Sequence, residues 1–395
     1  MNPVRLRHVP KHFFEGTHRA SDPETVCNNV RPLMAEIGVT GVEDLTGYDR
    51  LGIPVVAAHR PAAARGGSSI HAGKGLTRPA AEAAAMMAAV ERFSAEYRHQ
   101  QLEYAAYEEL GLTRAVDPAD LILPRDLEIG EKLQWVPSWD LLNEEEVAMP
   151  ANAVYHPYNP VGMAQQLFRS DSYGLAAGSC IEEAVLHGML EVVELDAMST
   201  AERSRHLGSR ITVDRDSPAG RMLERFTGEG IDIHLWLLPG KTGIPAVAAA
   251  ADDTVARDPA LVVVGSAAHT DPETAVIRAL TEVARNRAGY LHGRPDIVRE
   301  TVGRQAGYER LKRINRIWYR SSPETSLADI PGCATDAVDT DVGACIERIT
   351  PHTDRICIVD LTLTAVPVVR VIIPGFAVSY ADISRIPRTP ADRLY

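Results

Sequence analysis

Three stretches of this 395-residue chain place acidic side chains at a fixed distance from a glycine-bearing turn. In each stretch an alanine follows the turn, a position usually filled by glutamate comes seven residues later, and another ionisable residue follows one helical turn after that. The aligned residues are Ala81, Ala184 and Ala275, then Ala88, Glu191 and Glu282, then Glu91, Glu194 and Arg285. Residues three or four apart share one face of a helix, so the ionisable groups of each stretch lie along one stripe of its predicted helix and point to the same side.

A magnesium–nucleotide site would need such a set, because carboxylates bind Mg²⁺ and helix N-termini bind phosphate. The alternative is that these are solvated glutamates on ordinary alanine-rich surface helices. The flanks of Glu91, Glu191 and Glu194 are mostly apolar, however, with Val90 and Val193 beside them. A buried carboxylate without a cation or a hydrogen-bond partner is costly. The pattern therefore favours helices that converge on one cation-bearing pocket.

Composition restricts the class of protein and of partner. A net charge of −12 argues against nucleic acid as the main partner, although magnesium could still bring the positive charge that ATP needs. The five cysteines are scattered and show no CxxC or His/Cys zinc spacing, so we interpret them as reduced thiols of a cytoplasmic protein. No apolar run approaches the length of a membrane span, and nothing indicates a membrane protein.

Known nucleotide and hydrolase motifs are absent from the sequence. There is no GxxxxGK[ST] phosphate loop, no GxGxxG fingerprint, no GxSxG elbow and no HExxH helix. An ATP site in this chain would therefore be of neither the P-loop nor the Rossmann type.

The elements that must position the acidic residues are of mixed type. Helix starts are predicted at Asp22–Pro23–Glu24 and at Asp271–Pro272–Glu273, where a capping aspartate precedes a first-turn proline. Strands are predicted at residues 52–61, 133–142, 152–156, 231–239, 244–251, 261–270, 356–364 and 366–376. Strands often come in consecutive pairs, which predicts an α+β architecture, and the repeats suggest an internal duplication.

Read together, the three stretches resemble the YcaO superfamily. The matching residues are Gly73–Lys74–Gly75 with Glu91–Arg92, then 174–178 (GLAAG) with Glu183, Glu191, Glu194 and Asp196, then 278–282 (RALTE) with Arg287. The resemblance covers nearly the whole chain. It implies a YcaO fold, with mixed and antiparallel sheets and packed helices around an Mg–ATP site. We expect one integrated domain, 1–395, in which residues 1–60 form an N-terminal segment and residues 61–395 the catalytic core.

The resemblance also implies an activity, with ATP and Mg²⁺ as cofactors. Members of the family phosphorylate the oxygen of a peptide backbone amide, and a nucleophile then replaces that oxygen. Phosphorylation converts a poor leaving group into a good one, so the site has mainly to position the reactants and to neutralise charge. The expected partner is a peptide or protein substrate, and a homodimer is one possible assembly.

The family's site residues are carried over by position. The residues that match its magnesium carboxylates are Glu91, Glu183, Glu191, Glu194 and Glu282, and those matched to nucleotide contacts in addition are Arg19, Thr25, Ser179 and Arg278. Arg19 and Thr25 could equally be an ordinary surface arginine and a first-turn threonine. Lys74 is a further candidate for holding substrate or phosphate.

Two positions depart from the family pattern. Ala88 stands where the first helix usually has a glutamate, and Leu195 stands where the second usually has an arginine. The first change removes a possible ligand of the cation and the second removes a planar phosphate clamp. Either the subfamily tolerates these changes, or the site binds nucleotide differently, or the chain is catalytically impaired.

Three hypotheses differ in the nucleophile that replaces the amide oxygen, or in whether the chain has any turnover at all. Azoline-forming members commonly end in a proline-rich PxPxP tail, whereas residues 386–395 contain only Pro387 and Pro390. This favours the TfuA-associated branch, which resembles the enzymes that install glycine thioamides with a TfuA-like partner. The alternatives are a cyclodehydratase that forms azolines from Cys, Ser or Thr, and a degenerate scaffold that binds a peptide or partner without turnover.

Overall fold

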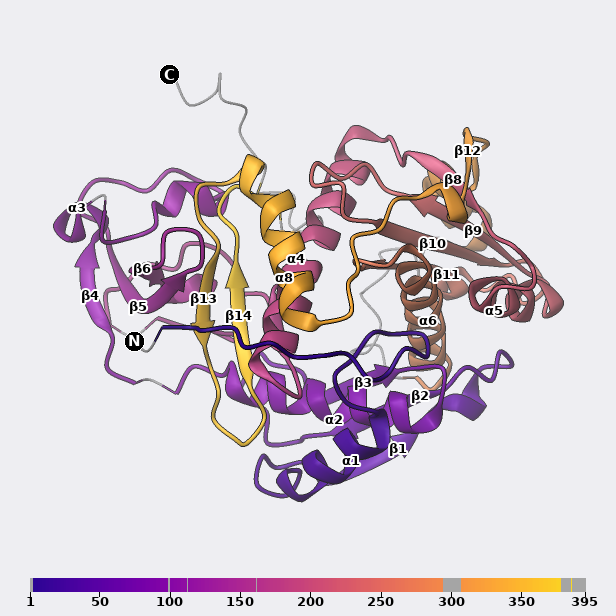
Figure 1. The fold of residues 1–395 in the computed structure, drawn as a ribbon, viewed down its shortest axis with the longest axis horizontal. Coiled ribbons are helices and arrows are strands. Elements are labelled where there is room, and N and C mark those ends of the chain that lie inside the picture. Colours follow the sequence, from indigo (N-terminus) through magenta and orange to yellow (C-terminus); the bar gives the residue numbers. More distant parts are fainter. Residues whose placement is uncertain are drawn as a thin grey trace.

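Within the described residues, three β-sheets and the helices packed on them make up the architecture (Figure 1). The computed structural model describes residues 3–98, 100–111, 113–160, 162–293, 307–377 and 385. All strand pairs in the sheets are antiparallel except the pair β12–β8, which is parallel. The predicted α+β class with mixed and antiparallel sheets is confirmed.

The sheets draw their strands from distant parts of the chain. The three-stranded sheet has the order β1 (Gly41–Asp44), β2 (Val55–His59), β3 (Ile70–Lys74). The five-stranded sheet has the order β11 (Val262–Ala268), β10 (Ala246–Asp253), β9 (Ile231–Leu237), β8 (Ser209–Thr212), β12 (Glu324–Ser326). The six-stranded sheet has the order β4 (Glu103–Ala106), β5 (Lys132–Asp140), β13 (Cys357–Asp360), β14 (Val368–Ile372), β7 (Leu175–Ala177), with β6 (Glu145–Pro150) paired to β5.

Helices connect and cover these sheets. They are α1 (Pro23–Val30), α2 (Arg78–Ser94), α3 (Tyr107–Leu110), α4 (Ile181–Ser204), α5 (Pro218–Gly228), α6 (Pro272–Leu291), α7 (Tyr308–Ile314) and α8 (Val338–Ile349). The two predicted helix starts are confirmed, because Asp22 and Asp271 accept hydrogen bonds from the backbone N–H groups of Thr25 and Thr274. No helix among the described residues is long and apolar enough to span a bilayer.

Each repeat of the sequence corresponds to an edge strand followed directly by a helix: β3 and α2, β7 and α4, β11 and α6. Glycine lets strand and helix approach closely. A Cβ atom on Gly73 would lie 2.2 Å from the carbonyl oxygen of Ala81, and one on Gly265 would lie 2.6 Å from that of Ala279. Only glycine fits at such distances. In the second repeat the corresponding glycine follows the strand, and a Cβ atom on Gly178 would lie 2.4 Å from the backbone nitrogen of Ala184. Glycine therefore permits the close strand–helix contact in all three repeats.

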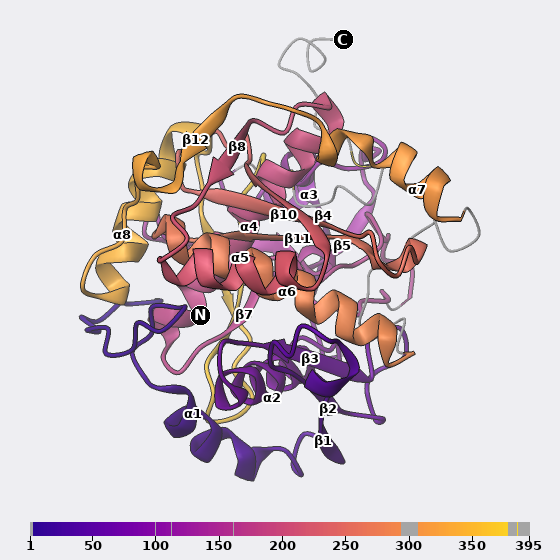
Figure 2. The same cartoon turned by 90° about the vertical axis from the view of Figure 1, so that its right-hand side faces the viewer.

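Helix α4 lies at the centre, between the six-stranded and the five-stranded sheets (Figure 1). Helices cover both faces of the five-stranded sheet, as the side chains of β10, which point alternately to the two faces, show. Ala248 and Ala250 pack in the cluster around α4, whereas Val247 and Ala249 pack in the cluster that contains α5 and α6. Figure 2 shows α5 and α6 beside β10 and β11. Because α4 is enclosed by both sheets, Glu182, Glu183 and Asp196 are buried, and Glu191 and Glu194 are half-buried.

One predicted strand is wrong. Residues 152–156 do not form a strand, because the partner strand β6 ends at Pro150 and a 3₁₀ turn, Ala151–Ala153, follows. The polar groups of Asn152 are satisfied by a loop instead, since its side chain donates to the carbonyl of Phe168 and accepts from the N–H of Leu167. The proline-poor tail, 386–395, lies outside the described residues, and the division at residues 60 and 61 stays a prediction.

Candidate active site

Three of the predicted carboxylates, Glu91, Glu191 and Glu194, lie close enough to influence one another. Glu91 comes from α2 and the other two come from α4. Burial raises the pKa of Glu91 to about 7. Burial, and then the charges of Glu91 and Glu194, raise the pKa of Glu191 to about 8. Ionising these carboxyl groups together is therefore unfavourable in this poorly solvated place, and a bound cation would stabilise their ionised forms.

Backbone and hydroxyl groups of the repeat turns hold these carboxylates. The N–H of Gly174 donates to Oε2 of Glu191 at 3.2 Å, and the N–H of Ala177, in β7, donates to Glu91. The hydroxyl of Ser266, in β11, donates to Oε1 of Glu194 at 2.5 Å. Two edge strands thus orient the acidic side chains of the neighbouring helices.

Glu282 forms a second group with two cations. Nζ of Lys74, at the end of β3, lies 2.6 Å from Oε2 of Glu282 on α6 and donates to the carbonyl of Arg278 at 2.9 Å. Arg285 pairs with the other oxygen of Glu282. Burial lowers the pKa of Lys74 to about 8, although the charge of Glu282 opposes this shift. The first and third repeats are joined at this point.

Arg278 lies between the two groups. Burial and the like charge of Arg19 lower the pKa of Arg278 to about 10, while Glu194, Glu282 and Glu191 act in the opposite direction. Within the described part of the chain, Nε of Arg278 is buried and has no hydrogen-bond acceptor. An unsatisfied guanidinium beside a cluster of carboxylates could bind a phosphate oxygen that also approaches the cation.

Glu183 forms a third group at the start of α4. Its Oε2 accepts from the N–H and the hydroxyl of Ser179 at 3.0 and 2.6 Å, and its Oε1 accepts from the N–H of Ala20 at 2.8 Å. Arg19, next to Ala20, lies near enough for its charge to act on Arg278. Thr25 stands apart, because its hydroxyl donates to Asp22 at 2.6 Å within the first turn of α1. In the structure Thr25 is thus a first-turn threonine of α1, which was the alternative to a nucleotide contact.

Two residues of the site were missed in the sequence. His187 precedes Glu191 by one helical turn, and its Nε2 lies 3.2 Å from Nη2 of Arg278. Burial lowers the pKa of His187 well below its usual value, so a neutral ring faces the arginine. Arg370 shares a face of β14 with Val368 and Ile372, and its charge acts on both Glu91 and Glu191. A lone arginine inside the apolar run 366–374 was the available signal for Arg370.

The two departures from the family pattern have different surroundings. Ala88, on α2, is half-buried and adds no carboxylate to the cluster. Leu195 is 1% exposed and packs in the interior, where an arginine would have to be accommodated at the expense of core packing. Arg92, which matches the family pattern, brings one positive charge to this side of the cluster, because its Nη1 lies 3.5 Å from Oε1 of Glu91.

The donor set fits magnesium and a phosphate chain, but it is not a preformed cage. Across the ranges that the structure describes, no three His, Cys, Asp or Glu side chains are grouped tightly enough to hold a metal ion. The predicted ligands stand in three neighbouring groups, around Glu191, Glu282 and Glu183. Carboxylate oxygens are the ligands Mg²⁺ prefers, and its charge would remove the cost of ionising Glu91 and Glu191.

Comparison with known proteins identifies the same family as the motifs. The sequence model of the YcaO family, described as an ATP- and Mg²⁺-binding cyclodehydratase, matches residues 72–377. A protein from Methanothermobacter thermautotrophicus is 44% identical over 364 residues, which cover 90% of this chain and 94% of that protein. A protein from the tfuA 3′ region of Rhizobium leguminosarum bv. trifolii is 32% identical over 313 residues, covering 75% and 71% of the two chains. YcaO from Methanopyrus kandleri, solved with AMPPCP and Mg²⁺, superposes with a TM-score of 0.79 at 31% identity, over 98% of this chain and 99% of that one.

Proposed function

Because the chain belongs to the YcaO family, we propose that it uses Mg–ATP to activate a peptide backbone amide and that sulfide then replaces the amide oxygen. The products would be a thioamide, ADP and phosphate, with the displaced oxygen leaving on the phosphate. The substrate would be a glycine-containing peptide or protein, and a TfuA-like protein would deliver the sulfur.

The observation that carries the proposal is the largely enclosed set of ionisable groups of opposite sign that α2, α4 and α6 bring together. Glu91, Glu191 and Glu194 bring three carboxyl groups together, and Arg278 lies near them with a buried Nε that has no hydrogen-bond partner among the described residues. A surface helix would have solvated these groups singly. Convergence from separate repeats is the arrangement that a cation and a phosphate chain require.

Roles for the individual residues follow from their surroundings. We assign Glu91, Glu191 and Glu194 as ligands of the cation. Glu183 and Glu282 would join them after giving up their present hydrogen bonds and ion pairs within the protein. Arg278, Arg19 and Lys74 would neutralise phosphate charge, and the Ser179 turn at the start of α4 would contribute hydrogen-bond donors. Bound Mg–ATP supplies the phosphoryl group, while these side chains orient it and exclude water.

Sulfur is preferred as the nucleophile for a specific reason. The relative from Rhizobium leguminosarum bv. trifolii lies in the tfuA 3′ region, which associates a similar chain with a tfuA gene. Azoline formation from Cys, Ser or Thr remains the second candidate, since the family's description is that of a cyclodehydratase. Ala88 and Leu195 motivate the third, a peptide-binding scaffold without turnover.

Mass spectrometry of a candidate peptide co-expressed with this chain and a TfuA-like protein tests the proposal. Replacement of oxygen by sulfur is expected, whereas loss of water would identify a cyclodehydratase. Glu191→Ala should abolish modification and ADP release because it removes a carboxylate from the centre of the cluster, whereas Glu347→Ala, at an exposed position of α8, should not. Failure of the wild-type protein to bind Mg–ATP or to release ADP would support the scaffold instead.

A further inference from the structure

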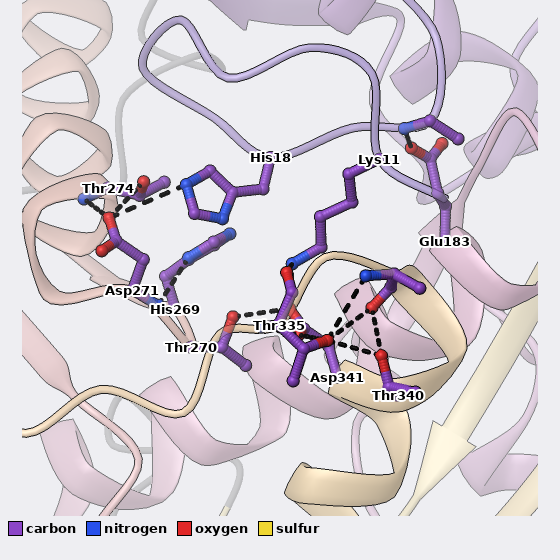
Figure 3. A network of polar contacts seen from close by, with 12 residues as sticks. Lys11, His18, Glu183, His269, Thr270, Asp271, Thr274, Thr335, Thr340 and Asp341 are labelled. Carbon is purple, nitrogen blue, oxygen red and sulfur yellow. Dashed lines mark hydrogen bonds and ion pairs between the residues drawn. The ribbon is translucent and has the colours of Figure 1, made fainter. Parts of the chain in front are cut away.

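An N-terminal strap, residues 9–20, folds back on itself and contacts both α8 and the start of α4 (Figures 1 and 3). At one end the N–H of Val338 donates to the carbonyl of Val9 at 2.8 Å, and the N–H of Lys11 donates to the carbonyl of Asp336 at 2.9 Å. At the other end the N–H of Ala20 donates to Glu183. The strap therefore connects α8 with one of the predicted magnesium carboxylates.

The anchor of this strap is a charged residue. Of residues 3–20, all of which are described, only Lys11 is buried. The side chains of Lys11 and Asp341 are both 0% exposed, and Nζ lies 2.6 Å from Oδ2 (Figure 3). Nζ also donates to the carbonyl of Thr335 at 2.8 Å. An apolar residue would anchor the strap without the cost of burying two charges, so stability alone does not explain the choice of lysine.

Asp341 is saturated by this arrangement. Its Oδ2 also accepts from the hydroxyl of Thr270 at 2.8 Å, and its Oδ1 accepts from the N–H and hydroxyl of Thr335 at 2.6 and 2.8 Å (Figure 3). Thr270 lies between β11 and α6, so the third repeat is tied to the same carboxylate. Directional hydrogen bonds of this kind fix a register, which a hydrophobic contact does not.

From Lys11 the register is transmitted along the strap by backbone hydrogen bonds. Phe13 and Arg19 form an antiparallel bridge, with N–H to carbonyl distances of 2.9 and 3.0 Å, and the N–H of His12 also donates to Arg19 at 2.8 Å. The ring of His18 packs edge-on against His269, with centroids 5.1 Å apart, so the loop rests on the turn before α6 (Figure 3). Arg19 therefore has a fixed position relative to Lys11.

We propose that Lys11 is a positioning residue: its pair with Asp341 sets the register of the strap so that Arg19 and the N–H of Ala20 reach the nucleotide pocket. This rests on the proposed function, because it assumes that the pocket binds Mg–nucleotide. Lys11 does not touch the nucleotide in this scheme. Its contribution is to hold the strap in the one alignment that serves both Glu183 and Arg278.

Lys11→Met tests the proposal, because methionine has a similar length but cannot donate a hydrogen bond. Calorimetric titration with Mg–AMPPCP should show affinity weakened by at least about tenfold, the effect of losing one charge-assisted contact. Hydrogen exchange at the Ala20 amide should accelerate at the same time. The matched control is Lys312→Met, whose Nζ also lies 2.6 Å from a fully buried carboxylate, that of Asp252 on β10. It should change neither the affinity nor the exchange of Ala20.

Leaving Asp341 buried and unpaired could prevent folding, so the double variant Lys11→Met/Asp341→Leu removes both charges. It should fold and still bind Mg–AMPPCP more weakly than wild type, because no directional anchor remains. Wild-type affinity with unchanged Ala20 exchange in either variant would overturn the positioning role. If the wild-type protein itself does not bind Mg–AMPPCP, the proposed function fails instead, and the two failures are thus distinguishable.

Discussion

Glu91 and Glu191 are held in a state that costs the folded protein free energy whenever both are ionised. Their pKa values of about 7 and about 8 exceed the value of about 4.3 expected for glutamate in an unfolded chain. At pH values between the unfolded pKa of about 4.3 and the folded pKa values of about 7 and about 8, the folded protein binds more protons than the unfolded chain. Their contribution to stability is therefore fully present below about pH 4 and is lost as the pH rises through 7 to 8.

Glu191→Gln should reveal this dependence in the absence of metal and nucleotide. The substitution removes the ionisable group. The melting temperature of Glu191→Gln minus that of the wild-type protein should therefore increase as the pH is raised from 6 to 9. Differential scanning calorimetry of both proteins at several pH values measures it, with Glu347→Gln as an exposed control. Saturating Mg–AMPPCP should reduce the pH dependence of the wild-type protein, because the cation stabilises the ionised carboxylates. An equal shift at all pH values would contradict the raised pKa of Glu191.

At this scale helical spacing was enough to propose the acidic residues and Arg278, but it did not point to Arg370. Helical spacing was enough to align Glu91, Glu191 and Glu194, because positions on one stripe of a helix are fixed by local geometry. Arg370 could not be found in this way, because its strand lies far from both helices in the sequence: Arg370 is 179 residues from Glu191 and 279 residues from Glu91. Strand order, which brings β14 beside β7, depends on long-range pairing that spacing does not encode.

At the scale of elements, the contact between strand and helix in each repeat depends on glycine. A Cβ atom on Gly265 would meet backbone atoms of α6, the carbonyl oxygen of Ala279 at 2.6 Å and the N–H nitrogen of Val283 at 2.7 Å. Backbone atoms cannot swing aside as a flexible side chain can. Either β11 or α6 must therefore shift, and α6 carries Arg278 and Glu282.

Gly265→Ala should destabilise the protein by about 3 kcal/mol, as expected for overpacking against a rigid neighbour. Urea unfolding followed by circular dichroism measures the change. Gly343→Ala is the matched control, because Gly343 lies within α8 and an added Cβ would meet nothing within 4 Å. That variant should gain about 0.5–1 kcal/mol from helix propensity. Equal effects of the two substitutions would show that close packing does not explain the glycine of the repeat.

Element types were largely predictable, whereas their neighbours were not. Asp22 and Asp271 identified helix starts because a cap is a local interaction. The strand predicted at 152–156 failed because apolar residues there pack in a loop beside Phe168 rather than in a sheet. The position of β3, β7 and β11 at sheet edges, which directs the repeat helices to one site, emerged only from the three-dimensional pairing.

At the scale of the whole molecule, a buried ion network joins the three-stranded sheet to the five-stranded sheet. Arg287 of α6 is 0% exposed and donates to both oxygens of Asp49 at 2.8 and 3.0 Å, and to Asp253 at 3.0 Å. Arg50 also donates to Asp253, at 2.7 and 2.9 Å. Asp49 lies between β1 and β2, and Asp253 ends β10, so this network fixes β3 and its Lys74 relative to α6.

Removing the centre of this network should cost far more than removing an exposed pair. Arg287→Met leaves two buried carboxylates without their shared cation, and the expected loss is about 3–5 kcal/mol in the free energy of unfolding. Arg257→Met, which breaks an exposed pair with Glu309, should cost at most about 1 kcal/mol. Both are measured by urea unfolding with linear extrapolation. Because Lys74 meets Glu282 across the same junction, folded Arg287→Met should also bind Mg–AMPPCP more weakly, whereas Arg257→Met should not. A loss below about 1 kcal/mol for Arg287→Met would mean that hydrophobic packing, rather than this network, holds the two sheets together.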